Sequence, residues 1–299
     1  MPLPAPARLT VVLLIAFVGL NAAGAATTAS PRIEANGAAL AQAMRGHRVV
    51  LLGEVHDNAA QHALRLAAVR RLLEQGARPA LAFEQFDRER QSDIDRARRA
   101  RPHDAAYLIA EAKGPPGWDW RYYRPFVELA LRYDLPIVAA NLSRKDAMKV
   151  AIEGWGALFD VATRSTLALD ELPVELRQKH EAAIAAGHCN LLPADALPAQ
   201  ARAQMARDIA LARSLVPFVE RGVVLLAGNG HVRRDIGVPV WLDATAKREA
   251  ISIGLLERGD DVTIPADAAT FDAYVITPRA RREDPCKALA AQFKRAAPR

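Results

Sequence analysis

Side chains suited to acid–base or metal chemistry follow four short apolar runs of this 299-residue chain. They comprise two carboxylates, two imidazoles and one amide, namely Glu54, His56, Glu84, Asn141 and His231. Carboxylates and imidazoles together can hold a zinc, iron or manganese ion, and they can also transfer protons without a metal. Glu54, His56, Glu84 and His231 are therefore the candidate catalytic residues, and the same four are the candidate ligands of a divalent metal ion.

The apolar runs themselves predict the sheet that positions these side chains. They are short, nearly continuous and separated by helical patterns, which indicates an α/β fold with a mainly parallel sheet covered by helices on both faces. The expected strands are residues 48–52, 80–83, 135–140, 223–227, 238–242, 250–256 and 273–276. Because the carboxyl ends of parallel strands share one edge, the five polar residues are expected to meet in a crevice there.

Two helical regions carry further expectations. In residues 57–75 an apolar stripe from Ala60 to Leu72 faces the core, and Arg65 falls on the opposite, solvent side; a shorter helix is expected at 125–132. Residues 144–216, between the third and fourth strands, show no clear strand pattern and predict a helical insertion. Composition allows a sizeable core, with 51% hydrophobic residues, and the net charge of +6 is spread thinly.

The arginine-rich segment 88–101 mixes both signs of charge. This spacing indicates a solvated helix face, and the alternative is a site for carboxylates such as propionates. Because the segment lacks interleaved aromatic residues and a wider basic field, a nucleic-acid partner is excluded.

Residues 118–123 (WDWRYY) form an aromatic cluster. The cluster either packs the next helix onto the sheet or gives a flat apolar wall to a large planar ligand, in which case a tyrosine can ligate ferric iron. His188 is either a surface residue or a lid contact. The candidate cofactor-binding residues are Tyr123, Tyr122, Trp120 and His188.

The first 25 residues predict a signal peptide, with Arg8, an apolar run at 11–20 and small residues at 22–25. An uncleaved signal anchor is the alternative. No cysteine lies directly after the apolar run, so we expect a protein exported to the periplasm and soluble after cleavage, without a lipid anchor. In that oxidising compartment Cys189 and Cys286 favour a disulfide; two unrelated thiols are the alternative.

Taken in order, several stretches resemble the ChaN family: residues 53–58, 83–84, 120–125, 140–142, 188–193, 204–208, 228–231, 237–239 and 284–286. The resemblance implies the α/β fold of the superfamily that includes Tiki proteases and erythromycin esterase. It also implies haem binding at the cell envelope, in a family where two haems can stack between two subunits with tyrosine as the iron ligand. Tyr123, and second Tyr122, are the positions to which that ligand would be carried over. ChaN proteins are often lipoproteins, whereas this sequence has no lipid-modifiable cysteine near its predicted signal, so membrane anchoring is not expected.

The sequence therefore predicts an exported haem-binding protein that acts in haem or iron acquisition, with residues 32–286 as its domain and 287–299 as a C-terminal tail. Its expected partners are haem, a second copy of the chain and iron-uptake components of the outer membrane or envelope. The alternative is a metal-dependent hydrolase, with His56 and His231 as ligands and Glu54 or Glu84 activating water. A third reading, an envelope interaction module without a ligand, leaves the clustered strand ends unexplained.

Overall fold

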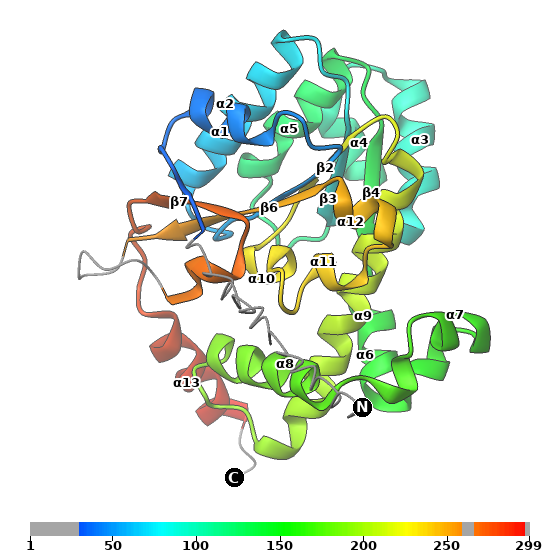
Figure 1. Ribbon diagram of the computed structural model, residues 1–299, viewed down its shortest axis with the longest axis vertical. Coiled ribbons are helices and arrows are strands. Elements are labelled where there is room, and N and C mark those ends of the chain that lie inside the picture. Colours follow the sequence, from blue (N-terminus) through cyan, green and yellow to red (C-terminus); the bar gives the residue numbers. More distant parts are fainter. Residues whose placement is uncertain (1–29, 259–265, 297–299) are drawn as a thin grey trace, which may run out of the picture.

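The structure, a computed structural model, describes residues 30–258 and 266–296. Seven strands form one sheet in the order β1-β7-β6-β2-β5-β3-β4 (Figure 1), and every neighbouring pair is parallel. The strands are β1 (Arg32–Ile33), β2 (Val49–Leu52), β3 (Ala80–Asp87), β4 (Ile137–Asn141), β5 (Val223–Leu226), β6 (Ala250–Glu257) and β7 (Ala273–Thr277). The predicted parallel α/β sheet is confirmed, and the predicted signal peptide lies outside the described residues.

One predicted strand is wrong. Residues 238–242 contain a short helix, α11 (Val238–Trp241), whose first turn includes Pro239. Proline has a fixed φ and no backbone N–H, which suits the first turn of a helix and does not suit a strand inside a sheet. The two-residue strand β1, at the sheet edge, was not predicted.

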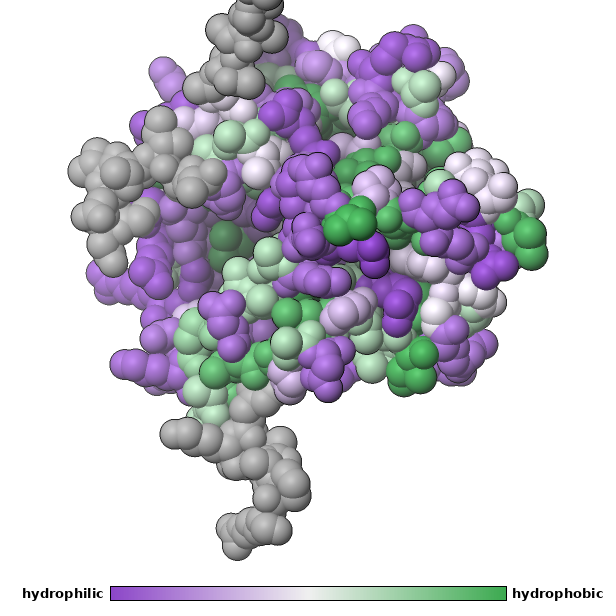
Figure 2. Space-filling model, turned by 60° about the horizontal axis from the view of Figure 1, so that its bottom comes forward, coloured by the Kyte–Doolittle hydropathy of each residue, from purple (hydrophilic) through white to green (hydrophobic). Residues whose placement is uncertain are grey.

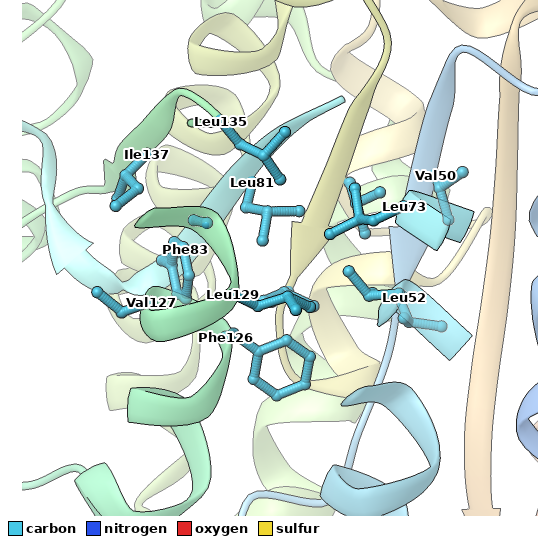
Figure 3. Close-up of a cluster of buried hydrophobic side chains, with 14 of the residues drawn as sticks. Val50, Leu52, Leu73, Leu81, Phe83, Phe126, Val127, Leu129, Leu135 and Ile137 are labelled. Atoms are coloured by element: carbon cyan, nitrogen blue, oxygen red, sulfur yellow. The ribbon is translucent and has the colours of Figure 1, made fainter. Parts of the chain in front are cut away.

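Five helices cover one face of the sheet. They are α1 (Gly37–Met44), α2 (Ala59–Glu74), α3 (Gln91–Ala100), α4 (Ala105–Glu111) and α5 (Trp120–Arg132). Alternate strand residues such as Val50 and Leu52 point into this layer (Figure 3), where they pack with Leu73 of α2 and Phe126 of α5. The alternation follows from the two-residue period of a strand.

The other face is covered by α9 (Leu197–Leu215), α10 (Asn229–Val232), α11 and α12 (Ala244–Arg248). Here the intervening strand residues Val49 and Leu51 pack with Leu211 and Leu215 of α9. Helices on both faces are therefore confirmed.

The predicted helical insertion is also confirmed. It contains α6 (Arg144–Glu153), α7 (Val161–Thr166), α8 (Val174–Gly187) and α9, and it has a small core of its own. Helix α13 (Pro285–Ala296) lies beside α8 in Figure 1, and a disulfide between Cys189 and Cys286 joins the two segments. The residues expected as a C-terminal tail thus begin inside α13. None of the helices in the described ranges is long and apolar enough to cross a membrane.

Helix α2 departs from its predicted amphipathic pattern. Its buried face includes Gln61, His62 and Arg65, whereas Ala60 is exposed. Arg65, expected on the solvent side, is 0% exposed. Ala68 and Leu72 of the predicted stripe are buried as expected, but the buried face also includes polar residues, because their partner is itself a buried polar group.

Candidate functional site

Glu54 lies directly beyond the end of β2 and is enclosed by polar side chains. The Tyr123 hydroxyl donates a hydrogen bond to Glu54 Oε1 at 2.6 Å, the Arg65 guanidinium forms an ion pair with Oε2, and His62 Nδ1 lies 3.2 Å from Oε2. Glu54 is only 2% exposed. A carboxylate is tolerated in the protein interior when it is paired and hydrogen-bonded, and these residues provide both.

His56 is the solvent-facing member of this first group. Its Nδ1 lies 3.0 Å from Glu54 Oε1, and its side chain is 51% exposed. The ring packs against Gly228, where an added Cβ would come within 2.7 Å of His56 Cε1. Trp118 meets the ring edge-on, at 4.9 Å between ring centroids. Gly228, which follows β5, therefore leaves room for the ring of His56, which follows β2.

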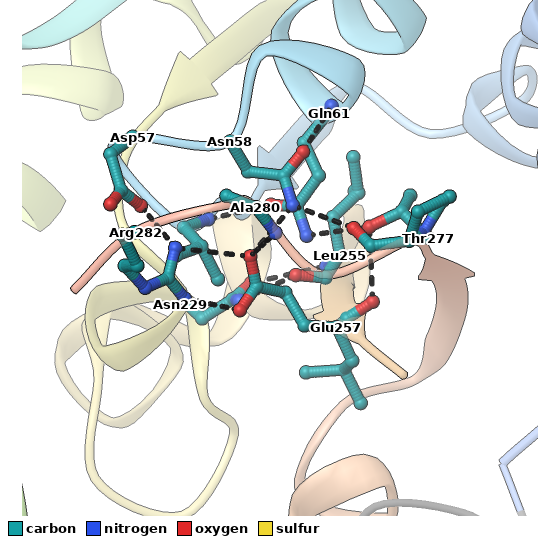
Figure 4. A network of polar contacts seen from close by, with 12 residues as sticks. Asp57, Asn58, Gln61, Asn229, Leu255, Glu257, Thr277, Ala280 and Arg282 are labelled. Carbon is teal, nitrogen blue, oxygen red and sulfur yellow. Dashed lines mark hydrogen bonds and ion pairs between the residues drawn. The ribbon is translucent and has the colours of Figure 1, made fainter. Parts of the chain in front are cut away.

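A polar network lies next to His56 at the carboxyl edge of the sheet. Arg282, in the segment before α13, pairs with Asp57 at 2.6 Å and with Glu257 at the end of β6 (Figure 4). Glu257 also accepts a hydrogen bond from the Asn58 side chain at 2.7 Å. This network ties the C-terminal segment to the carboxyl edge of the sheet.

The second group is built around His231, in α10. Its Nδ1 lies 2.6 Å from Asp208 Oδ1, and its Nε2 lies 3.3 Å from Glu84 Oε1. Glu84 also accepts a hydrogen bond from the Gly228 backbone N–H at 2.7 Å. All three side chains are buried. An imidazole between two carboxylates is an arrangement that favours its protonated form.

The pKa values follow from this arrangement. Burial alone would lower the pKa of His231, but the charges of Glu84 and Asp208 outweigh it and raise the pKa to about 10. For Glu84, burial would raise the pKa, and His231 lowers it to about 2. Burial dominates for Asp208 and raises its pKa to about 6 despite His231. At neutral pH the group therefore carries an imidazolium held by its two carboxylate neighbours.

The structure thus brings the predicted strand-end residues to one edge, in two carboxylate–imidazole groups that meet at Gly228. Asn141 lies at the same edge, where it accepts a hydrogen bond from the Leu142 backbone N–H at 2.8 Å. Within residues 30–258 and 266–296, no three His, Cys, Asp or Glu side chains are grouped so that they could hold a metal ion. The four predicted metal ligands pair with each other and with helix residues instead.

The aromatic cluster mainly joins α5 to this edge. Tyr123 is 1% exposed, and burial raises its pKa. Tyr122 stacks on His62 with 4.4 Å between ring centroids, and Trp120 packs on Phe86 at 5.0 Å. The packing interpretation of this cluster is therefore the one that the geometry favours.

A cavity of about 570 Å³ lies between α6, α8, α9 and α13. Its lining is Arg144, Ala147, Met148, Ile184, His188, Leu192, Gln200, Ala203, Gln204, Arg207 and Leu289. The volume is in the range of small-molecule and cofactor sites. Gln204 Nε2 lies 3.3 Å from both ring nitrogens of His231, so the cavity adjoins the second buried group.

Of the candidate cofactor residues, His188 alone lines this cavity. Its Nδ1 lies 2.8 Å from the carbonyl oxygen of Ile184, one turn earlier in α8. A ring nitrogen facing a carbonyl must donate, so Nε2 keeps the lone pair that a metal would need. The disulfide at the next residue, Cys189, fixes α13 and its Leu289 against the same cavity.

The helix residues that complete the site were not predicted. Arg65 and His62 come from α2, and Asp208, Gln204 and Arg207 come from α9. The stretch 204–208 belongs to the family resemblance, which marked its place without assigning a role. For Arg65 the available signal was a charged residue four positions from Gln61 and three from His62, a polar stripe that can face a buried carboxylate.

Known proteins resemble this chain in sequence and in fold. Residues 40–242 match the model of a family described as haem-binding uptake, Tiki superfamily, ChaN. Among solved structures, ChaN of Campylobacter jejuni with cofacially bound haem is similar, with 23% identity, a TM-score of 0.60, and coverage of 75% of this chain and 86% of that chain. A mutant of erythromycin esterase EreC in its open conformation matches with 15% identity and a TM-score of 0.42, over 76% of each chain. The chain matches no curated protein sequence.

Proposed function

Because the chain belongs to the family of haem-binding uptake proteins that includes ChaN, we propose that it binds haem in the cavity between the insertion and α13. Most of the apolar lining comes from Ala147, Met148, Ile184, Leu192 and Leu289. Such a wall suits a flat macrocycle, because burial of apolar surface drives its binding. Haem would supply the iron centre.

The observation that carries this proposal is the orientation of His188. Its Nδ1 is engaged by the Ile184 carbonyl, which leaves Nε2 as the nitrogen for an axial ligand. By contrast, Tyr123 is buried and hydrogen-bonded to Glu54, and Tyr122 stacks on His62; neither lines the cavity. Iron ligation by either tyrosine stays a prediction, and it would require these contacts to rearrange.

A haem titration followed by absorbance tests the proposal. We expect saturable binding by the wild-type protein, and for His188→Ala an altered spectrum with affinity lower by about tenfold or more, which corresponds to ~1.4 kcal/mol. His47→Ala is the matched control, because His47 is exposed before the start of β2, at the opposite edge of the sheet. Absence of saturable binding by the wild type would contradict the proposal.

The wider role that we propose is haem or iron acquisition at the cell envelope after export. Its support is the family and the amino-terminal sequence pattern described above. Mass spectrometry of the protein recovered from the periplasm checks the export step. A mature chain that begins at Ala26 is the expected result, and retention of residues 1–25 would contradict it.

Haem-linked pairing of two copies is part of the same proposal. The solved structure of ChaN from Campylobacter jejuni shows cofacial haem binding. In this chain Met148, which lines the cavity, is exposed, and so are Ile152 and Leu191 of the insertion. The face of the molecule drawn in Figure 2 mixes hydrophobic residues with hydrophilic ones. We expect the molar mass in solution to double on haem addition; an unchanged mass would remove the dimer from the proposal.

A second candidate, hydrolysis, is favoured by the exposure of His56. Its Nδ1 faces the buried Glu54, so its Nε2 can accept a proton from water at the protein surface. Release of p-nitrophenol from p-nitrophenyl acetate, with and without EDTA, tests this activity and its dependence on metal. Turnover that is lost in His56→Ala would support it. Equal rates for the variant and the wild type would exclude this site.

A further inference from the structure

Two arginines lie together at the end of the cavity nearest to the sheet. Arg144 is the first residue of α6, which follows the end of β4 at Asn141. Arg207, on α9, donates to the Leu142 carbonyl oxygen at 2.8 Å and lies 3.4 Å from Asn141 Oδ1. Both arginines line the cavity, and among the residues that the structure describes no acidic one does.

Neither guanidinium has an ion-pair partner in the part of the chain that the structure describes. Arg207 is half-buried, and burial lowers its pKa, while Glu84, Asp87 and Asp208 act in the opposite direction from beyond ion-pair distance. Two of these carboxylates are already engaged, since Glu84 and Asp208 both pair with His231. Within the described residues, Arg207 donates hydrogen bonds only to a carbonyl oxygen and an amide oxygen, so it keeps N–H donors for a ligand.

We infer that the cavity selects ligands that carry carboxylates, and that Arg144 and Arg207 bind the two propionate groups of haem. This inference rests on the proposed function and adds to it the residues that would bind the polar end of haem. The planar guanidinium matches a carboxylate through two parallel hydrogen bonds, which a neutral ester cannot provide. The apolar residues of α6, α8 and α13 contact the macrocycle, and the arginine end fixes its orientation.

Paired titrations with haem and with haem dimethyl ester, in which both propionates are blocked, test the inference. For the wild type we expect haem to bind about tenfold or more tightly than the ester, as charge-assisted hydrogen bonds predict. Arg144→Gln and Arg207→Gln should each weaken haem binding and leave ester binding unchanged. Arg213→Gln is the control, because Arg213 is exposed on the same helix, outside the cavity.

The outcomes separate the inference from the proposed function. Equal affinities for haem and ester, with no effect of the two variants, would overturn the inference and leave haem binding intact. Loss of binding for both ligands in a variant would also overturn it, because that result indicates a general disturbance of the cavity. If neither ligand binds the wild type saturably, the proposed function fails, and the inference fails with it.

Discussion

The Tyr123 hydroxyl donates a 2.6 Å hydrogen bond to Oε1 of Glu54, although the two residues are 69 positions apart. This bond joins α5 to the segment after β2. It occupies Oε1 of Glu54, while Arg65 and His62 contact Oε2. Tyr123 therefore has a structural partner in the protein, and a role in ligating iron would compete with it.

Removal of this hydroxyl should change stability more than haem binding. Tyr123→Phe leaves the buried Glu54 with one donor fewer, so we expect the free energy of unfolding to fall by about 1–3 kcal/mol. Urea denaturation measures this loss. The absorbance of the haem-bound variant should equal that of the wild type, and a changed spectrum would instead establish Tyr123 as an iron ligand.

Arg65 should be among the most sensitive positions of the chain. It is 0% exposed and forms an ion pair with Glu54. Arg65→Met keeps most of the side-chain volume but leaves the carboxylate buried without its cation, which costs about 3–5 kcal/mol. We expect a large fall in the urea midpoint. The double variant Arg65→Met, Glu54→Gln should recover part of the loss, and no recovery would show that Glu54 is not the partner that matters.

The raised pKa of His231, in the group with Glu84 and Asp208, predicts that the folded protein becomes less stable at alkaline pH. His231 has a pKa of about 10 in the folded chain and an ordinary value of 6.5, so its contribution is complete below pH 6.5 and is lost as pH rises to about 10. Asp208, with a pKa of about 6, and Glu84, with a pKa of about 2, change protonation below this window. The free energy of unfolding should therefore fall by up to about 1.4 kcal/mol per pH unit.

Urea denaturation between pH 6.5 and 9.5 checks this slope against His231→Gln. The difference in stability between wild type and variant should narrow as pH rises, because the wild type loses the charge that the variant never had. A constant difference would show that His231 is not protonated in the folded protein.

The sequence was sufficient to predict which polar residues meet at the carboxyl edge of the sheet, but not which helix residues contact them. Short apolar runs predict strands, and the shared carboxyl edge of parallel strands then brings Glu54, Glu84 and His231 together. In the structure β2, β5 and β3 are indeed adjacent. The apolar run at 238–242 gave a wrong strand, because the four apolar residues around Pro239 satisfy a strand pattern and a helical turn equally.

The buried charged residues on the helices and the cavity could not be predicted in this way. Arg65 and Asp208 lie on helices, where a charged residue normally marks the solvent face, so periodicity assigns them to the wrong side. Their burial depends on a partner that another element supplies, Glu54 for Arg65 and His231 for Asp208. The cavity needs the packing of α6, α8, α9 and α13, which is a tertiary property.

The disulfide should stabilise both the fold and the cavity. The bond between Cys189 and Cys286 closes a sequence separation of 97 residues and holds α13 against the insertion. Because a cross-link restricts the unfolded chain, Cys189→Ser combined with Cys286→Ser should lower the free energy of unfolding by about 2–5 kcal/mol. Thermal unfolding monitored by circular dichroism measures this effect, with dithiothreitol treatment of the wild type as the matching chemical test.

The same double variant should weaken haem binding, because Cys189 adjoins His188 and α13 supplies Leu289 to the cavity. Without the bond, helix α13 can leave the cavity wall, and the apolar contact that it gives to the macrocycle is lost. A haem titration at a temperature where the variant is still folded separates this effect from unfolding. Affinity equal to that of the wild type would mean that α13 stays in place by packing alone, or that haem does not bind in this cavity.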